Sequence, residues 1–220
     1  FDLIEDCDFD TVFTAIGLGG STVGTIRNCE IIADGFPVSF GHYVGGAGSV
    51  QSLDNTSILS RRQDDSFMGF MYFGSLYVGF NWTVGEIKDS TLANASGAEV
   101  SHSAGALVNE GTIGTITSSS STEFTRIEAP VVAIDNTGTI SLIEGVYTRI
   151  VSAGKAIENG QDGIIGEIKE GLFQAGTGLA LDNKTGATVT KITGGIFESV
   201  SGSVGALAGA GTFSNVQGGY

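Results

Sequence analysis

The chain has 220 residues, of which 41% are hydrophobic and only 15% charged, and it contains 35 glycines but 2 prolines. Its net charge of −14 disfavours nucleic-acid binding, because Lys and Arg must replace counterions on phosphates. The same charge disfavours an anionic membrane surface, and no apolar run approaches the ~20 residues that a membrane-spanning helix needs.

A four-residue unit, apolar-x-x-apolar, recurs nine times along the whole chain. The last positions of successive copies are separated by 22 to 34 residues. In chain order the copies occupy residues 1–4, 23–26, 50–53, 84–87, 113–116, 140–143, 165–168, 189–192 and 213–216. Self-similarity at such a period is typical of stacked repeat architectures.

The residues around each copy favour strands over helices. Gly, Thr, Ser, Val and Ile dominate, and Gly costs about 1 kcal/mol per helical position relative to Ala. We interpret each period as one coil of about three short strands, which pair with their equivalents in the next coil about 4.8 Å away. Nine rungs would then span about 38 Å. The sequence therefore predicts an all-β fold, a parallel β-solenoid of about nine rungs.

An asparagine recurs three residues after an alanine upstream of four successive copies. We expect these side chains to form a ladder at one corner, because Asn tolerates the left-handed conformation and its amide can bond the copies above and below. Unrelated turn asparagines are the alternative. The four residues are Asn109, Asn136, Asn159 and Asn183.

An aromatic residue recurs downstream of the last copies, and we expect these rings to stack along the solenoid axis. They are Tyr147, Phe173, Phe197 and Tyr220.

The two cysteines fall at equivalent points of adjacent rungs, since Ile4-Glu-Asp-Cys7 matches Ile26-Arg-Asn-Cys29. Their Cα atoms would lie about 4.8 Å apart, which is within disulfide range. In-register neighbours, however, point their Cβ atoms in parallel, which strains a bridge. We therefore expect two stacked free thiols, buried as small apolar groups.

The longest interval between copies predicts an aromatic-rich insertion at 54–83 within a single domain, 1–220. Long excursions from a solenoid rung are a common place for binding or catalysis. One interpretation is a sugar-binding or partner-binding platform that uses Tyr72, Tyr77 and Trp82. The alternative is a pair of apolar strands that continue the wall and cover the core. A second long segment, 117–130, carries a serine run and reads as a flexible loop on one corner.

Acidic residues supply the remaining candidates for chemistry. Cleavage of polysaccharides needs paired carboxylates, for which Asp64 and Asp65 in the insertion are the candidate catalytic residues. Adjacent strand residues point to opposite faces, which argues against them. Asp135, Glu158 and Asp182 share one repeat position, and such a like-charge column is costly unless its members are spread apart or bridged by cations such as Ca²⁺. No other metal or cofactor is expected.

The rung pattern Ala-Φ-x-Asn-x-Gly-x-Φ-x-x-Φ, where Φ is apolar, resembles the right-handed parallel β-helix (pectate-lyase-like) superfamily. In particular it looks like β-helical segments of phage tail spikes and fibres and of bacterial surface adhesins. The resemblance covers essentially the whole chain and implies a right-handed winding. Lyases of this superfamily are expected to carry Arg and acidic calcium ligands along one face, and no such cluster maps onto a residue here.

These observations predict a structural or adhesive β-helical shaft, located outside the cell as part of a phage virion fibre or a surface filament. The alternative is a polysaccharide-degrading tail spike. Both ends of the sequence lack a polar cap, so we expect a longer chain, or self-association by end-to-end rung stacking or trimerisation. A host or environmental glycan is a further candidate partner, whereas nucleic acid and membrane insertion are not expected.

Overall fold

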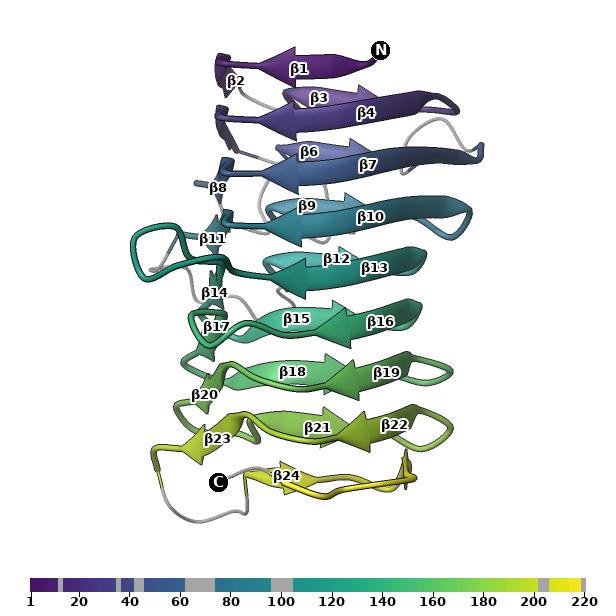
Figure 1. The fold of residues 1–220 in the computed structure, drawn as a ribbon, viewed down its shortest axis with the longest axis vertical. Helices are drawn as coiled ribbons and strands as arrows, with labels where there is room; N and C mark the ends of the chain where they lie inside the picture. The colour runs from purple at the N-terminus through teal and green to yellow at the C-terminus, as the bar shows by residue number, and fades with distance from the viewer. Residues whose placement is uncertain are drawn as a thin grey trace.

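The computed structural model describes residues 1–11, 14–34, 37–41, 46–61, 74–95, 105–201 and 206–218. These residues form 25 short strands, and every strand pairing among them is parallel. In the described part of the chain no helix is long and apolar enough to span a membrane. The strands stack into three sheets that surround one core, with the two termini at opposite ends of the stack (Figure 1).

Sheet 1 contains the nine repeated units and has nine strands. Its strands are β1 (Leu3–Glu5), β4 (Thr22–Arg27), β7 (Gly48–Asp54), β10 (Trp82–Lys88), β13 (Thr112–Thr117), β16 (Thr139–Ile143), β19 (Ile164–Ile168), β22 (Thr188–Ile192) and β25 (Thr212–Phe213).

Sheet 2 has eight strands, each of which follows a strand of sheet 1 after a corner that is short except before β14, where it spans 118–125. They are β2 (Asp8–Thr11), β5 (Glu30–Ala33), β8 (Ser57–Ser60), β11 (Thr91–Asn94), β14 (Arg126–Ala129), β17 (Arg149–Ser152), β20 (Leu172–Ala175) and β23 (Ile196–Ser199).

Sheet 3 also has eight strands and completes each coil before the chain returns to sheet 1. They are β3 (Ile16–Leu18), β6 (Val38–Phe40), β9 (Leu76–Val78), β12 (Leu107–Asn109), β15 (Val132–Asn136), β18 (Lys155–Asn159), β21 (Leu181–Asn183) and β24 (Leu207–Ala208).

The chain winds in a right-handed sense. In Figure 1 it runs along sheet 1 at the front, turns back through sheet 2 and returns along sheet 3 behind, while it descends from the N-terminus to the C-terminus. The predicted parallel β-solenoid is confirmed, but the count of nine rungs is slightly too high. Nine, eight and eight strands make eight complete three-strand coils and the first strand of a ninth.

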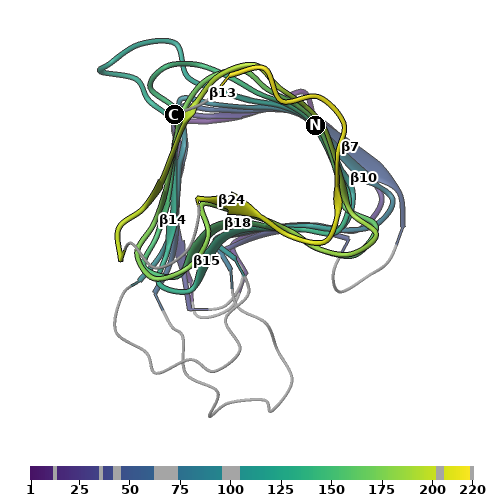
Figure 2. The same ribbon diagram turned by 90° about the horizontal axis from the view of Figure 1, so that it is seen from below.

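The apolar-x-x-apolar unit encodes a bend within the sheet 1 strands from β4 to β22, which contain it whole. In β10, Val84 and Ile87 are fully buried, whereas Gly85 and Glu86 between them are not. Two consecutive outward residues interrupt the strict alternation of a flat strand, so the strand wraps around the core (Figure 2). The inward residues stack in register on the next coil, as Ile143 does on Ile168 and Ile168 on Ile192.

The predicted asparagine ladder is confirmed at the corner where sheet 3 returns to sheet 1. All four side chains are fully buried. The Asn109 amide donates to the Asn136 carbonyl oxygen at 2.7 Å, Asn136 donates to Asn159 at 2.7 Å, and Asn159 donates to Asn183 at 2.8 Å. Each amide also donates to a backbone carbonyl in the following coil. The ladder therefore holds four successive coils in one register.

The predicted aromatic column is only partly correct. Phe173 and Phe197 stack in the core with ring centroids 4.6 Å apart, but the in-register partner of Phe173 in the preceding coil is Ile150. Tyr147 is 39% exposed at the surface. The corner before β17 spans five residues, two more than the corner before β20, and this extra length moves Tyr147 out of register. Tyr220 lies outside the described residues.

The predicted insertion at 54–83 contains two regular strands, β8 and β9, so the coil continues through it. The extra length of this interval falls between Arg61 and Gly74. Asp64, Asp65 and Tyr72 lie in that stretch, outside the described residues.

Candidate functional site

Trp82 lies in the core, which corrects the interpretation of its ring as part of a surface platform. Only 1% of the residue is exposed, and the indole stacks on Phe40 with ring centroids 5.5 Å apart. A Cβ atom built on Gly48 would lie 2.4 Å from the edge of this indole, and one on Gly41 would lie 2.5 Å from it. The absence of side chains at these two glycines makes room for the indole, so the role of Trp82 is to pack the core.

Tyr77 lies on the outer face of sheet 3 and is half-buried. Its hydroxyl donates to the Glu110 carboxylate at 2.6 Å, and its ring packs against Val108 of the next coil. Burial and the bond to Glu110 raise the pKa of the Tyr77 hydroxyl well above its ordinary value. The ring therefore covers the outside of the sheet, and its hydroxyl is held by a neighbouring coil.

The predicted acidic column exists, since Asp135, Glu158 and Asp182 are in-register neighbours on β15, β18 and β21. Lysines, however, lie among its members. The Lys155 ammonium contacts Glu158 and lies 2.7 Å from Asp182, and Lys184 lies 2.7 Å from Asp182 and 3.7 Å from Glu158. Two of the three carboxylates are thus neutralised by the chain itself. Within the described ranges no group of three His, Cys, Asp or Glu residues is arranged to hold a metal ion.

Asp135 differs from the other two carboxylates. Burial, together with the negative charges of Glu158 and Glu110, raises the pKa of Asp135 to about 6, although Lys155 acts in the opposite direction. Burial also acts to raise the pKa of Asp182, but hydrogen bonds from Lys155 and Lys184 outweigh it and lower that pKa. Lysines therefore compensate the charges of Glu158 and Asp182, whereas burial and neighbouring negative charges disfavour ionisation of Asp135.

The corner between sheets 1 and 2 has a recurring local structure in the first four coils. One Asp or Asn per coil adopts the left-handed conformation there, with φ between 45° and 52°. Asp and Asn are among the few residues that tolerate this region. These residues are Asp6, Asn28, Asn55 and Asp89.

The residue that follows each of these carries a thiol or hydroxyl. Its sulfur or oxygen atom bonds to the backbone carbonyl two residues earlier, and in the second to fourth coils that carbonyl also accepts a backbone N–H from the preceding coil. These bonds are Cys7 Sγ to Glu5 at 3.1 Å, Cys29 Sγ to Arg27 at 3.2 Å, Thr56 Oγ1 to Asp54 at 3.0 Å and Ser90 Oγ to Lys88 at 2.7 Å.

An open hollow of about 360 Å³ runs along this corner across several coils. Apart from Cys29, its lining residues carry carboxylates, side-chain amides or hydroxyls, although their carbon atoms form a large part of the surface. The lining residues are Asp8, Asn28, Cys29, Glu30, Asn55, Thr56, Ser57, Asp89 and Thr91. A surface of this composition offers hydrogen-bond acceptors and donors to a ligand rich in hydroxyl groups.

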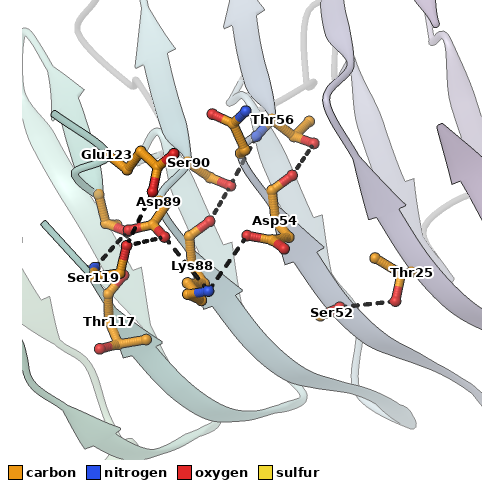
Figure 3. Close-up of polar contacts among 12 residues, drawn as sticks. Thr25, Ser52, Asp54, Thr56, Lys88, Asp89, Ser90, Thr117, Ser119 and Glu123 are labelled. Atoms are coloured by element: carbon orange, nitrogen blue, oxygen red, sulfur yellow. Dashed lines mark hydrogen bonds and ion pairs between the residues drawn. The ribbon is translucent and has the colours of Figure 1, made fainter. Parts of the chain in front are cut away.

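A loop, residues 118–125, projects from the sheet 1–2 corner (Figure 2) and is attached to Asp89, which lines the hollow. Figure 3 shows how it is attached: Ser119 donates its backbone N–H and its hydroxyl to the Asp89 carboxylate, at 2.6 Å and 2.7 Å. Lys88 lies between Asp54 and Asp89, with its ammonium 4.0 Å and 3.6 Å from their oxygens. The serine-rich segment predicted as a flexible loop is thus held to the preceding coil by a buried carboxylate.

Two exposed aromatic residues follow the hollow on the next coils. Phe124 lies near the end of the projecting loop and is 37% exposed, and Tyr147 is 39% exposed. Each lies two residues before one member of the in-register pair formed by Arg126 and Arg149, so the two aromatic residues lie on neighbouring coils of the same corner. The sheet 1–2 corner therefore combines a polar hollow with an aromatic surface, and we define it as the candidate site.

Sequence reasoning missed this corner, although a signal for it was present. The match between residues 4–7 and 26–29 extends to Leu53-Asp-Asn-Thr56 and Ile87-Lys-Asp-Ser90, once thiol and hydroxyl side chains are treated as equivalent. Phe124 and Tyr147 carry a signal of their own, because Phe124-Thr-Arg-Ile127 matches Tyr147-Thr-Arg-Ile150.

No protein-family model, no curated protein and no solved structure matches this chain. The parallel β-solenoid is what the structure itself shows.

Proposed function

We propose that this chain is a structural and adhesive β-helical shaft of an extracellular fibre, either a phage virion fibre or a cell-surface filament, and that the sheet 1–2 corner contacts glycans. The observation that carries the proposal is the unbroken in-register stacking of nine sheet 1 strands over one continuous core. Its right-handed winding is also that of the superfamily which the rung pattern resembles.

The stacking supports the mechanical part of the proposal. Each coil is joined to the next by three strand pairings, by apolar columns and, over four coils, by the asparagine ladder. Ion pairs also join neighbouring coils, as between Arg27 and Glu5 at 2.6 Å and between Lys191 and Glu167 at 2.8 Å. Exposed ion pairs add little individually, ~0–1 kcal/mol each, so hydrophobic stacking and backbone bonds supply most of the stiffness.

The corner supports the adhesive part. Sugars are bound through hydrogen bonds to their hydroxyls and by packing of their apolar faces on aromatic rings. The hollow supplies the carboxylates and amides, and Phe124 and Tyr147 supply exposed rings on adjacent coils. Because Asp8, Glu30 and Asp89 line the hollow, we propose neutral or amine-bearing glycans as ligands and not polyanionic ones.

A glycan array probed with the purified chain tests the adhesive function. We expect binding to neutral or amino-sugar polymers, and a loss of at least tenfold in affinity in the Phe124→Ala/Tyr147→Ala double variant. Phe80→Ala is the matched control, because Phe80 is 79% exposed before β10, on the corner where sheet 3 returns to sheet 1. Equal loss of affinity in the control, or no binding to any array member, would contradict the proposed glycan contact.

The location and assembly of the protein test the structural function. Antibodies against the chain should label extracellular fibres or virions of the native source, and the chain should self-associate in sedimentation at micromolar concentration. Label confined to the cell interior, or a monodisperse monomer, would contradict the shaft. Release of reducing ends from a bound polysaccharide would instead favour the polysaccharide-degrading spike.

A further inference from the structure

Cys7 and Cys29 form a matched pair on neighbouring coils. The strand residues on either side of them are in register, with Glu5 opposite Arg27 and Asp8 opposite Glu30. Both thiols make the same contact, each with the carbonyl two residues earlier, so the side chains leave the corner in the same direction. Both cysteines are free, as the sequence predicted, but only Cys29 is buried and Cys7 is half-buried.

The spacing of the pair permits a covalent bond. In-register residues on neighbouring strands are about 4.8 Å apart, and disulfides need Cα atoms roughly 4.4–6.8 Å apart. The Cβ atoms must converge from their parallel directions. Both residues lie outside the strands, between β1 and β2 and between β4 and β5, and the backbone bond nearest to the pair runs from Glu30 N–H to the Cys7 carbonyl at 3.0 Å.

Access to the pair is unequal. Cys7 is half-buried, whereas Cys29 is only 3% exposed, at the wall of the polar hollow. A small reagent therefore reaches Cys7 first, and Cys29 is placed to react in a second, intramolecular step.

We propose that Cys7 and Cys29 form a reversible disulfide that ties the first coil to the second, made by exchange with a low-molecular-weight disulfide. This proposal is independent of the glycan contact.

The exchange takes two steps. The Cys7 thiolate attacks one sulfur of the small disulfide, so a mixed disulfide forms and one small thiolate leaves. The Cys29 thiolate then attacks the Cys7 sulfur, the protein disulfide forms and the second small thiolate leaves. Two electrons pass from the two protein thiols to the small disulfide, and the two thiol protons go to the departing thiolates or to solvent.

The bond would act on the first coil. In a solenoid each coil contacts only its neighbours, so this bond would act on the single interface between the first and second described coils. A covalent link across that interface limits how far β1 and β2 can separate from β4 and β5. The opening of this coil should therefore respond to thiol redox conditions, while the coils below do not.

The test incubates the purified chain, at low concentration, with oxidised glutathione. Intact-mass analysis after alkylation should show the loss of two hydrogens and no alkylated thiol, and peptide mapping should recover a Cys7–Cys29 cross-link. Hydrogen exchange over residues 1–11 should slow at least tenfold and return to its starting rate after dithiothreitol. Exchange over 139–192 should not change.

Cys7→Thr and Cys29→Thr are the matched variants, because the third coil carries Thr56 at the same position with the same carbonyl contact. Cys29→Thr should accumulate a mixed glutathione adduct at Cys7, whereas Cys7→Thr should stay largely unmodified at the buried Cys29, and neither should show redox-dependent exchange. If Cys29→Thr fails to fold, Cys7→Thr still carries the comparison. Wild-type chain that stops at a glutathione adduct, or that forms only intermolecular dimers, would overturn the proposal.

Discussion

Ser119 and Asp89 are joined by two hydrogen bonds across neighbouring coils, from the serine backbone N–H at 2.6 Å and from its hydroxyl at 2.7 Å. Only 3% of the Asp89 side chain is exposed, so its carboxylate depends on these partners and on Lys88. The relationship explains how an eight-residue projection beside the candidate site keeps a defined position. Hydrogen bonds to charged groups contribute about 1.5–3 kcal/mol each.

Asp89→Ala should release this loop from the preceding coil. We expect faster proteolysis and faster hydrogen exchange over residues 118–125, because both bonds to Ser119 are lost. Ser119→Ala should have a smaller effect, since its backbone N–H still donates to Asp89. Ser121→Ala, an exposed position on the same loop, is the control. Equal protection in Asp89→Ala and wild-type protein would show that the bonds do not hold the loop.

Asn136 occupies the middle of the buried ladder, and Asn109 occupies its end. Asn136→Ala should lower the free energy of unfolding by ~2–4 kcal/mol, because it leaves the Asn109 amide and the Asn159 carbonyl oxygen without these partners. Asn109→Ala should cost less, ~1–2 kcal/mol, since the Asn109 side-chain oxygen has no hydrogen-bond partner among the described residues. Urea denaturation monitored by circular dichroism measures both, and equal losses would argue against a cooperative ladder.

Asp135→Asn should make stability depend differently on pH. The folded-state pKa of Asp135 is about 6 against an ordinary value of 3.8, so ionisation disfavours the folded state. Stability is lost as pH rises from about 4 to about 6. The variant should therefore be more stable than wild type by ~1–3 kcal/mol at pH 7.5 and equally stable below pH 4.

Asp182→Asn is the opposing control for this measurement. Its pKa is lowered by Lys155 and Lys184, so its contribution to stability is present at neutral pH and lost on acidification. The variant should be destabilised at pH 7.5. Denaturation midpoints measured at pH 7.5 and below pH 4 test both expectations. If Asp135→Asn and Asp182→Asn changed stability in the same direction at pH 7.5, the assigned charges would be contradicted.

Trp82 should behave as a core residue and not as a ligand contact. Trp82→Ala should cost ~3–5 kcal/mol of stability, and Trp82→Phe much less, because the aromatic contact with Phe40 is retained. Since Trp82 is the only tryptophan, its fluorescence reports this site alone. The emission should have the short wavelength of a buried indole and should not shift when a glycan binds. A shift of the emission on glycan binding would contradict the assignment of Trp82 to the core and favour a role in ligand binding.

Much of the fold could be predicted from the order of residues. The apolar pairs at Val84 and Ile87 and at their equivalents are compatible with one arrangement, in which successive copies stack and bury both columns. The asparagine ladder and the paired free thiols follow from the same translation by one coil. These features occur once in each coil that contains them, so they recur in the sequence at the period of the coil and can be recognised there.

The candidate site was harder to predict because it depends on differences between coils. Phe124 and Tyr147 lie on neighbouring coils although corners of unequal length, 118–125 and 144–148, precede β14 and β17, and Trp82 of β10 packs inward against Gly41 and Gly48. Only the structure shows that Lys155 and Lys184 lie among the acidic residues of β18 and β21.

The sequence by itself determined the parallel stacking, since inward-facing Val, Ile and Leu at a coil-length period can leave water together only when the coils lie in register. The tertiary structure alone decided which side chains meet across the sheet 1–2 corner. That choice depends on how far each irregular corner extends, and on contacts between residues some 30 positions apart, such as Asp89 and Ser119, that no local pattern encodes.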